Sequence, residues 1–126
     1  GPVAVVNEPG AEGTAFLPQP SASEWFLDVG RRPGVLWQNS VLLQRAFGSE
    51  PPFDPGVCIP HLHAAALFVV ATDDDVANTE AERKAYEKAP DPKELVMIEG
   101  HHFTPYSGEA LTSAATAARD WFLRWL

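Results

Sequence analysis

Three consecutive segments decide the fold: "AAALFVVAT" (64–72), "TEAERKAYEKAP" (79–90) and "ELVMIE" (94–99). The first is a continuous apolar run with β-branched residues, which is typical of a strand buried on both faces of a parallel sheet, and the third predicts the next strand. The second begins with a capping box formed by Thr79 and Glu82 and stops at Pro90, so it predicts a helix. A strand, a helix and a strand in this order predict a βαβ unit, the building block of an open α/β sheet.

The last segment, "GEALTSAATAARDWFLRWL" (108–126), predicts an amphipathic helix. Its apolar residues recur at the spacing of one helix face: Leu111, Ala114, Ala115, Ala118, Trp121, Phe122 and Trp125. The last three form an aromatic cluster at the end of that face. We expect this face to pack on the sheet. Because two strands offer too little apolar surface for it, we also expect a further partner surface.

The first half of the chain has a different character. Prolines and glycines are dense there, and two segments between them, 21–30 and 35–48, predict short helices, the first with Ser21 as its cap. We therefore expect a loop-rich, lid-like or linking segment over residues 1–59 and the regular α/β unit over residues 60–126.

Composition narrows the class of protein. Of the 126 residues, 45% are hydrophobic, which is enough for a packed core. The formal net charge of −8 argues against nucleic acid as a partner, because phosphate binding draws on Lys and Arg. No apolar run approaches the roughly 18 residues of a membrane helix, so we expect no membrane association. The single cysteine, Cys58, has no partner for an internal disulfide and favours a cytoplasmic location.

Two loops leave the carboxyl ends of the predicted strands. The first, "TDDDVAN" (72–78), contains three aspartates, and the second, "EGHHFTPYSG" (99–108), contains His101 and His102. In open α/β sheets, ligands bind outside the carboxyl ends of the strands. We expect the βαβ unit to bring an aspartate and a histidine together at this edge. A carboxylate that accepts the Nδ1–H of an imidazole fixes its tautomer and stabilises the imidazolium, which is the acid–base half of a catalytic triad.

The sequence around these loops resembles the C-terminal part of an α/β-hydrolase. The segments that carry the resemblance are "ALFVVATDDDVAN" (66–78), "KELVMIEGHHFTPYSGE" (93–109) and "AARDWFLRWL" (117–126). The resemblance implies that Asp74 is the acid of a catalytic triad and that His102 is its histidine. His101 stands where the family usually has a second glycine.

The resemblance also implies a fold class and a function. The fold is α/β, with parallel strands, a crossover helix and a closing C-terminal helix, as in the C-terminal portion of a hydrolase. The function is that of a serine-type hydrolase acting on esters or related acyl bonds. The sequence lacks the G-x-S-x-G elbow that holds the family's nucleophile. We therefore expect another segment or chain to supply the nucleophile and the oxyanion hole, and no activity from this chain alone.

Other interpretations of the site residues stay open. A shift of one residue would make Asp73 or Asp75 the acid, and aspartates before a helix are also favourable without any catalysis. His61 and His63 resemble a pair of metal ligands, but they lie at the amino end of a strand about 25 Å long, far from the two loops. We therefore expect no metal site, and no cofactor.

The expected partners are a complementary N-terminal hydrolase segment or a second copy of the chain, together with a small-molecule acyl substrate. Trp25, Phe26 and Trp37 would line or cover the substrate pocket. The alternative function is a non-catalytic binding or dimerisation module that keeps half of the hydrolase fold.

Overall fold

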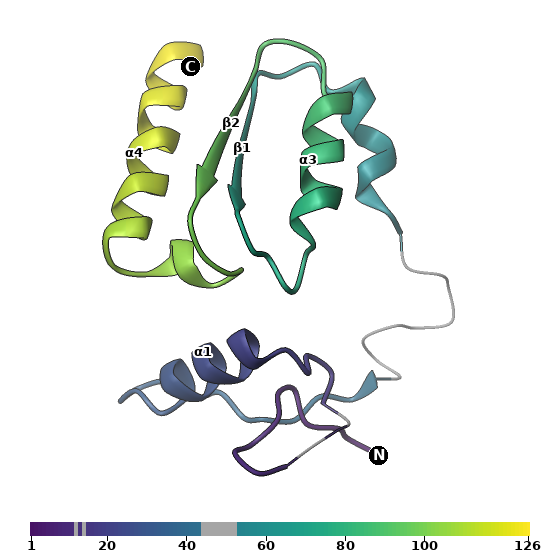
Figure 1. Ribbon diagram of the computed structural model, residues 1–126, viewed down its shortest axis with the longest axis vertical. Coiled ribbons are helices and arrows are strands. Elements are labelled where there is room, and N and C mark those ends of the chain that lie inside the picture. Colours follow the sequence, from purple (N-terminus) through teal and green to yellow (C-terminus); the bar gives the residue numbers. More distant parts are fainter. Residues whose placement is uncertain (12, 14, 44–52) are drawn as a thin grey trace. The chain divides into compact units, whose positions relative to one another are not determined.

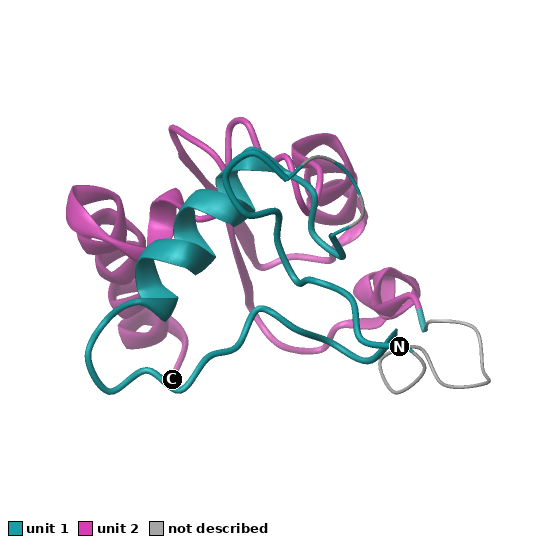
Figure 2. Cartoon of the chain, turned by 90° about the horizontal axis from the view of Figure 1, so that it is seen from below, with its two compact units in different colours: residues 1–53 teal, residues 54–126 magenta. Residues whose placement is uncertain are grey.

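The protein divides into two compact units, residues Gly1–Phe53 and Asp54–Leu126 (Figure 2). The computed structural model describes residues 1–11, 13, 15–43 and 53–126. No helix within these ranges combines the length and the apolar character needed to cross a bilayer.

A parallel pair of strands forms the centre of the second unit. Strand β1 (Ala66–Ala71) runs beside strand β2 (Lys93–Ile98), with Ala66 opposite Lys93 and Ala71 opposite Ile98. The helix α3 (Thr79–Lys88) connects them, and the helix α4 (Gly108–Trp125) ends the unit. Figure 1 shows the strands between these two helices. The predicted α/β fold class is thus confirmed, and both strands and both helices predicted over residues 60–126 are in place.

The helices α3 and α4 pack on the strands, but the predicted burial on both faces is incomplete. In β1, Val70 and Ala71 are buried and the other residues are half-buried, whereas in β2 only Ile98 is buried. Phe68 in β1 packs its ring edge against Tyr86 in α3, with the centroids 5.6 Å apart. The core of the unit is formed by the buried residues Val70, Ala71, Ala89, Ile98, Phe103 and Trp121. Of the aromatic cluster in α4, only Trp121 is buried, whereas Phe122 is 56% exposed and Trp125 is 46% exposed.

The start of α3 differs from the predicted capping box. Asn78, not Thr79, is the capping residue, and its Oδ1 accepts a hydrogen bond from Ala81 N at 3.1 Å. Thr79 is the first residue of the helix, and its hydroxyl bonds to the end of β1 instead. The helix ends at Lys88 because Pro90 holds Ala89 in an extended conformation.

Two short 3₁₀ helices complete the second unit. The helix η2 (Thr104–Tyr106) leads into α4, and η1 (Pro55–His61) packs against α3. Because of this packing, η1 belongs to the second unit, which begins at Asp54, whereas we expected the loop-rich segment to extend to residue 59.

The first unit contains the helix α1 (Pro20–Gly30), which confirms the first of the two predicted short helices. Its capping residue is Gln19, however, and Ser21 is a buried residue inside the first turn, because Pro20 already occupies the first helical position. A proline is favourable at this position, since it has no N–H that needs a partner.

The second predicted short helix is wrong over residues 35–42, which form no helix. Val41 instead pairs with Val3 in an antiparallel bridge, and the side chain of Asn39 bonds to both N and O of Val6, at 2.9 and 3.0 Å. The rest of that prediction, residues 44–48, lies outside the described residues.

Candidate active site

The two loops that leave β1 and β2 are joined by backbone hydrogen bonds. Thr72 N donates to Ile98 O and Asp73 N donates to Gly100 O, both at 2.9 Å. These bonds continue the parallel pairing past the ends of the strands. The hydroxyl of Thr72 adds a third link, because it accepts a hydrogen bond from Gly100 N at 3.1 Å. The two loops are therefore held next to each other at the carboxyl edge.

Asp74 is fixed within the first of these loops. Its Oδ1 accepts hydrogen bonds from Val76 N at 2.9 Å and from Ala77 N at 2.6 Å. Its backbone N donates to the hydroxyl of Thr79 at 2.9 Å, and that hydroxyl donates to Ala71 O at 2.8 Å. The Asp74 side chain is 4% exposed. The loop's own N–H groups thus hold the carboxylate in one orientation, while Thr79 ties the backbone of Asp74 to the end of β1.

His102 faces Asp74 from the second loop. Its Nδ1 lies 2.7 Å from Asp74 Oδ2, and its side chain is 25% exposed. The edge of its ring packs against Phe103, with the centroids 4.8 Å apart. The structure therefore brings together the two residues predicted to form the pair.

The turn that carries His102 depends on Gly100. This glycine has a φ of 129°, and a Cβ there would overlap the side chain of Thr104, whose hydroxyl accepts a hydrogen bond from His101 N at 3.0 Å. His101, at the place of a second glycine, has no positive φ. Its ring nitrogen Nδ1 accepts a hydrogen bond from Phe103 N at 3.2 Å. The position that requires a glycine is thus 100, and a histidine at position 101 is compatible with the turn.

The charge state of Asp74 follows from these contacts. Burial by itself raises the pKa of Asp74, but the hydrogen bonds from His102, Ala77 and Val76 more than offset this and hold the pKa below its ordinary value. Asp74 is therefore anionic at neutral pH and accepts the Nδ1–H of His102. In the neutral ring, Nε2 then carries the lone pair that takes up a proton.

A cavity of about 420 Å³ adjoins the pair. Four ionisable side chains line this cavity: Asp74, Glu82, His102 and Tyr106. Its other lining residues are apolar: Val69, Ala71, Pro105, Leu111, Ala114, Ala115 and Ala118. Sequence reasoning missed Glu82 as a site residue and assigned it to a capping box. The sequence feature that could have indicated this role is the spacing of three residues between Thr79 and Glu82, which places both side chains on one face of the helix.

The other candidate residues lie elsewhere. Asp73 Oδ2 accepts a hydrogen bond from the hydroxyl of Thr72, and neither Asp73 nor Asp75 takes the place of Asp74 beside His102. His63 lines a separate cavity of about 520 Å³, together with Trp121, Phe122 and Trp125. Within residues 1–11, 13, 15–43 and 53–126, no three His, Cys, Asp or Glu side chains converge as metal ligands would.

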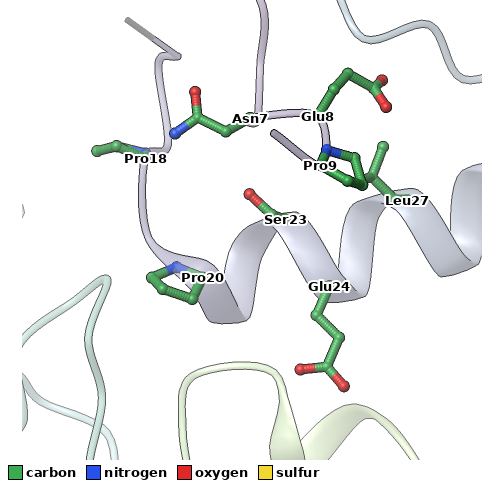
Figure 3. A pocket seen from close by; sticks show the side chains of 8 residues that line it. All are labelled: Asn7, Glu8, Pro9, Pro18, Pro20, Ser23, Glu24 and Leu27. Atoms are coloured by element: carbon green, nitrogen blue, oxygen red, sulfur yellow. The ribbon is translucent and has the colours of Figure 1, made fainter. Parts of the chain in front are cut away.

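The first unit has a cavity of its own, of about 340 Å³ (Figure 3). It is lined by three prolines and by polar and apolar side chains: Asn7, Glu8, Pro9, Pro18, Pro20, Ser23, Glu24 and Leu27. Trp25, Phe26 and Trp37, which we expected at a substrate pocket, are not among these residues. They form a ring cluster instead, with centroids 5.0 and 5.6 Å apart.

Comparison with known proteins gives one informative match. No protein family and no curated protein sequence matches the chain. A solved structure that does match is the crystal structure of the α/β hydrolase GrgF from Penicillium sp. sh18, with a TM-score of 0.70 and 21% sequence identity. The match covers 98% of this chain and 42% of that one, so the chain spans less than half the length of that hydrolase. The fold of this chain is that of part of an α/β-hydrolase.

Proposed function

We propose that this chain supplies the acid and the base of a serine-type hydrolase that acts on esters or related acyl bonds. The observation that carries the proposal is the 2.7 Å contact between His102 Nδ1 and a buried Asp74 carboxylate that backbone N–H groups hold in place. A buried carboxylate that orients an imidazole at the carboxyl edge of a parallel sheet suits general base catalysis. The α/β-hydrolase fold supports the same assignment.

In the proposed reaction, His102 carries protons. Its Nε2 accepts the hydroxyl proton of a serine on another segment while the serine oxygen forms a bond to the acyl carbon. The imidazolium then gives that proton to the leaving alcohol as the acyl–oxygen bond breaks. Water hydrolyses the acyl-enzyme by the same proton transfers in reverse. Asp74 stays ionised throughout and stabilises the imidazolium.

The proposed partner is a complementary hydrolase segment that carries the serine elbow and the oxyanion hole. Within the described residues, β1 pairs with β2 alone, so its other edge is open for a further strand. The cavity next to Asp74 and His102 is lined by Val69 and Ala71 of β1 and by small apolar residues of α4. An apolar cavity and an unpaired strand edge both suit the packing of additional sheet and helix.

Reconstitution tests this proposal. The chain is purified alone and mixed with a complementary segment that carries a serine elbow, and each sample is assayed with p-nitrophenyl esters of increasing acyl length. We expect hydrolysis in the mixture alone. We expect His102→Ala to lower its rate about 10²–10⁴-fold, while the matched control His101→Ala keeps most of it. Hydrolysis in the mixture that is insensitive to His102→Ala would contradict the assignment.

A second candidate function has support from α4. Phe122, Leu123 and Trp125 expose apolar surface, and Leu123 is 79% exposed. This surface suits a non-catalytic dimerisation module in which a second copy of the chain is the partner. Light scattering on the purified chain distinguishes the two accounts. A stable dimer that loses its association on Leu123→Glu favours the module.

A further inference from the structure

Glu82 is an ionisable residue of the site that the proposed mechanism does not use. It lies in α3 and lines the same cavity as Asp74 and His102. Its Oε2 is buried, and no group in the described part of the chain donates a hydrogen bond to it. A buried carboxylate oxygen without a donor is costly, so a structural role alone does not account for a glutamate at this place.

The geometry of α3 explains why Glu82 lies at the cavity that Asp74 and His102 also line. Thr79, Glu82 and Tyr86 lie three and four residues apart and therefore share one helix face. Thr79 bonds to the end of β1, and Tyr86 packs on Phe68 in the same strand. Glu82 lies between these two contacts. Side chains in helices lean towards the N-terminus, which here is the side of the Asp74 loop.

Electrostatics couple Glu82 to both members of the pair. Burial raises the pKa of Glu82, the negative charge of Asp74 raises it further, and the positive charge of His102 partly offsets both. The remaining ionisable group of the cavity is Tyr106. The strand β1 and the cavity-lining positions of α4 contribute no ionisable group. The ionisable residues of η1, which packs against α3, are Cys58 and His61, and both are exposed.

We infer that Glu82 is a third ionisable member of the site, a positioning residue that controls the protonation of His102 together with Asp74. The inference rests on the proposed function, because it assigns a proton carrier to His102. When Glu82 is ionised, the imidazolium has a second negative neighbour and is stabilised. When Glu82 takes up a proton from solvent, this support is withdrawn. The site then acts as a base whose strength depends on the state of Glu82.

Nuclear magnetic resonance on this chain tests the inference without any nucleophile or substrate. Carbon shifts of the Glu82 carboxyl and nitrogen shifts of the His102 ring are followed against pH in the parent chain, Glu82→Gln, Asp74→Asn and the control Glu80→Gln. Glu80 lies on the same helix, is exposed and pairs with Lys84 at 3.7 Å. Glu82→Gln keeps the size of the side chain and removes its charge, so it is expected to fold.

We expect Glu82→Gln to lower the pH at which the His102 imidazolium loses a proton to become neutral, by at least about half a unit. Glu80→Gln should leave that pH unchanged. Asp74→Asn should bring the pKa of Glu82 down towards its ordinary value, since one cause of the shift is removed. An equal response of His102 to both glutamine substitutions overturns the inference. So does a Glu82 titration that ignores Asp74→Asn.

These outcomes are separate from the test of hydrolysis. If the reconstituted mixture is inactive while the titrations respond as expected, the three groups are coupled and the catalytic proposal fails. If the mixture is active and the titrations do not respond, His102 and Asp74 keep their proposed roles and Glu82 has none. Glu82→Asp, which keeps the charge and shortens its reach, should lie between the parent chain and Glu82→Gln.

Discussion

The second unit has a histidine beside a cavity at each end of its parallel strands, and the two ends are built differently. At the carboxyl end, His102 contacts the buried Asp74 carboxylate, which two backbone N–H groups hold in place, and a third hydrogen bond fixes the Asp74 backbone. At the amino end, His63 is exposed and lies among aromatic side chains. Cavity size does not distinguish the ends, since the volumes are about 420 and 520 Å³.

The two ends differ because the chain makes different contacts before and after the parallel strands. Chain leaving the carboxyl ends of β1 and β2 continues the pairing through Thr72 and Asp73, and this places the two loops side by side. The turn before α3 then contributes the N–H groups of Val76 and Ala77, and the first residue of α3, Thr79, binds the backbone of the acid. At the amino end, the chain packs apolar rings instead. The groups that orient a histidine therefore indicate a catalytic role in this fold better than the presence of a nearby cavity does.

The largest effect that separates the two ends concerns catalysis. In the reconstituted enzyme, Asp74→Asn should lower kcat about 10³–10⁴-fold, because an amide no longer stabilises the imidazolium. His63→Asn should leave kcat within about twofold of the parent value. Steady-state kinetics with a p-nitrophenyl ester measures both. A larger loss for His63→Asn than for Asp74→Asn would place the chemistry at the amino end.

The next largest effect concerns stability at the amino end. Trp121 is 6% exposed, so Trp121→Ala should cost about 3–5 kcal/mol of unfolding free energy. Trp125→Ala, at a position 46% exposed, should cost about 1 kcal/mol or less. Urea unfolding followed by circular dichroism checks both values. Equal costs would mean that the exposed part of α4 is covered in solution, as the dimer account requires.

Sequence reasoning predicted most of the second unit because its signals are local. The apolar runs of β1 and β2 and the periodicity of α4 are patterns among neighbouring residues, and they indicate these elements although Trp121 alone is buried in α4. The meeting of an aspartate and a histidine followed from one topological rule, since parallel strands end at the same edge. The resemblance to the hydrolases selected Asp74 and His102 among neighbouring residues of the same type. The physical reason for Asp74 depends on the structure, because its carboxylate accepts the N–H groups of Val76 and Ala77.

What the sequence did not reveal depends on contacts between distant residues. Glu82 fits the pattern of a capping box, but the capping function belongs to Asn78, which adopts a φ of 71° that no pattern indicates. Residues 35–42 read as helical, yet Asn39 bonds to the backbone of Val6, 33 positions earlier. Such contacts outweigh helix propensity, which contributes less than 1 kcal/mol per residue.

A smaller effect tests how the carboxyl end is held together. Thr79→Val keeps the shape of the side chain and removes the hydroxyl that links Ala71 O to Asp74 N. We expect a loss of about 1–3 kcal/mol in unfolding free energy, because both backbone groups lose their partner. Thr112→Val is the matched control, since the Thr112 hydroxyl makes only a long, exposed bond of 3.4 Å to Gly108 O. Equal losses would mean that the bridge does not support the site.

The smallest effect we expect is the acid dependence of stability that Asp74 contributes. Its pKa in the folded chain lies below the ordinary value, so its contribution is fully present above the pKa of the unfolded chain. That contribution is lost as the pH falls through the folded pKa, because protonation breaks the contact with His102. The unfolding free energy should therefore fall less steeply between neutral pH and pH 3 in Asp74→Asn than in the parent chain. The control is Asp120→Asn, because Asp120 is exposed and pairs with Arg119. If both variants follow the parent curve, the carboxyl end contributes no more to acid stability than an ordinary surface pair.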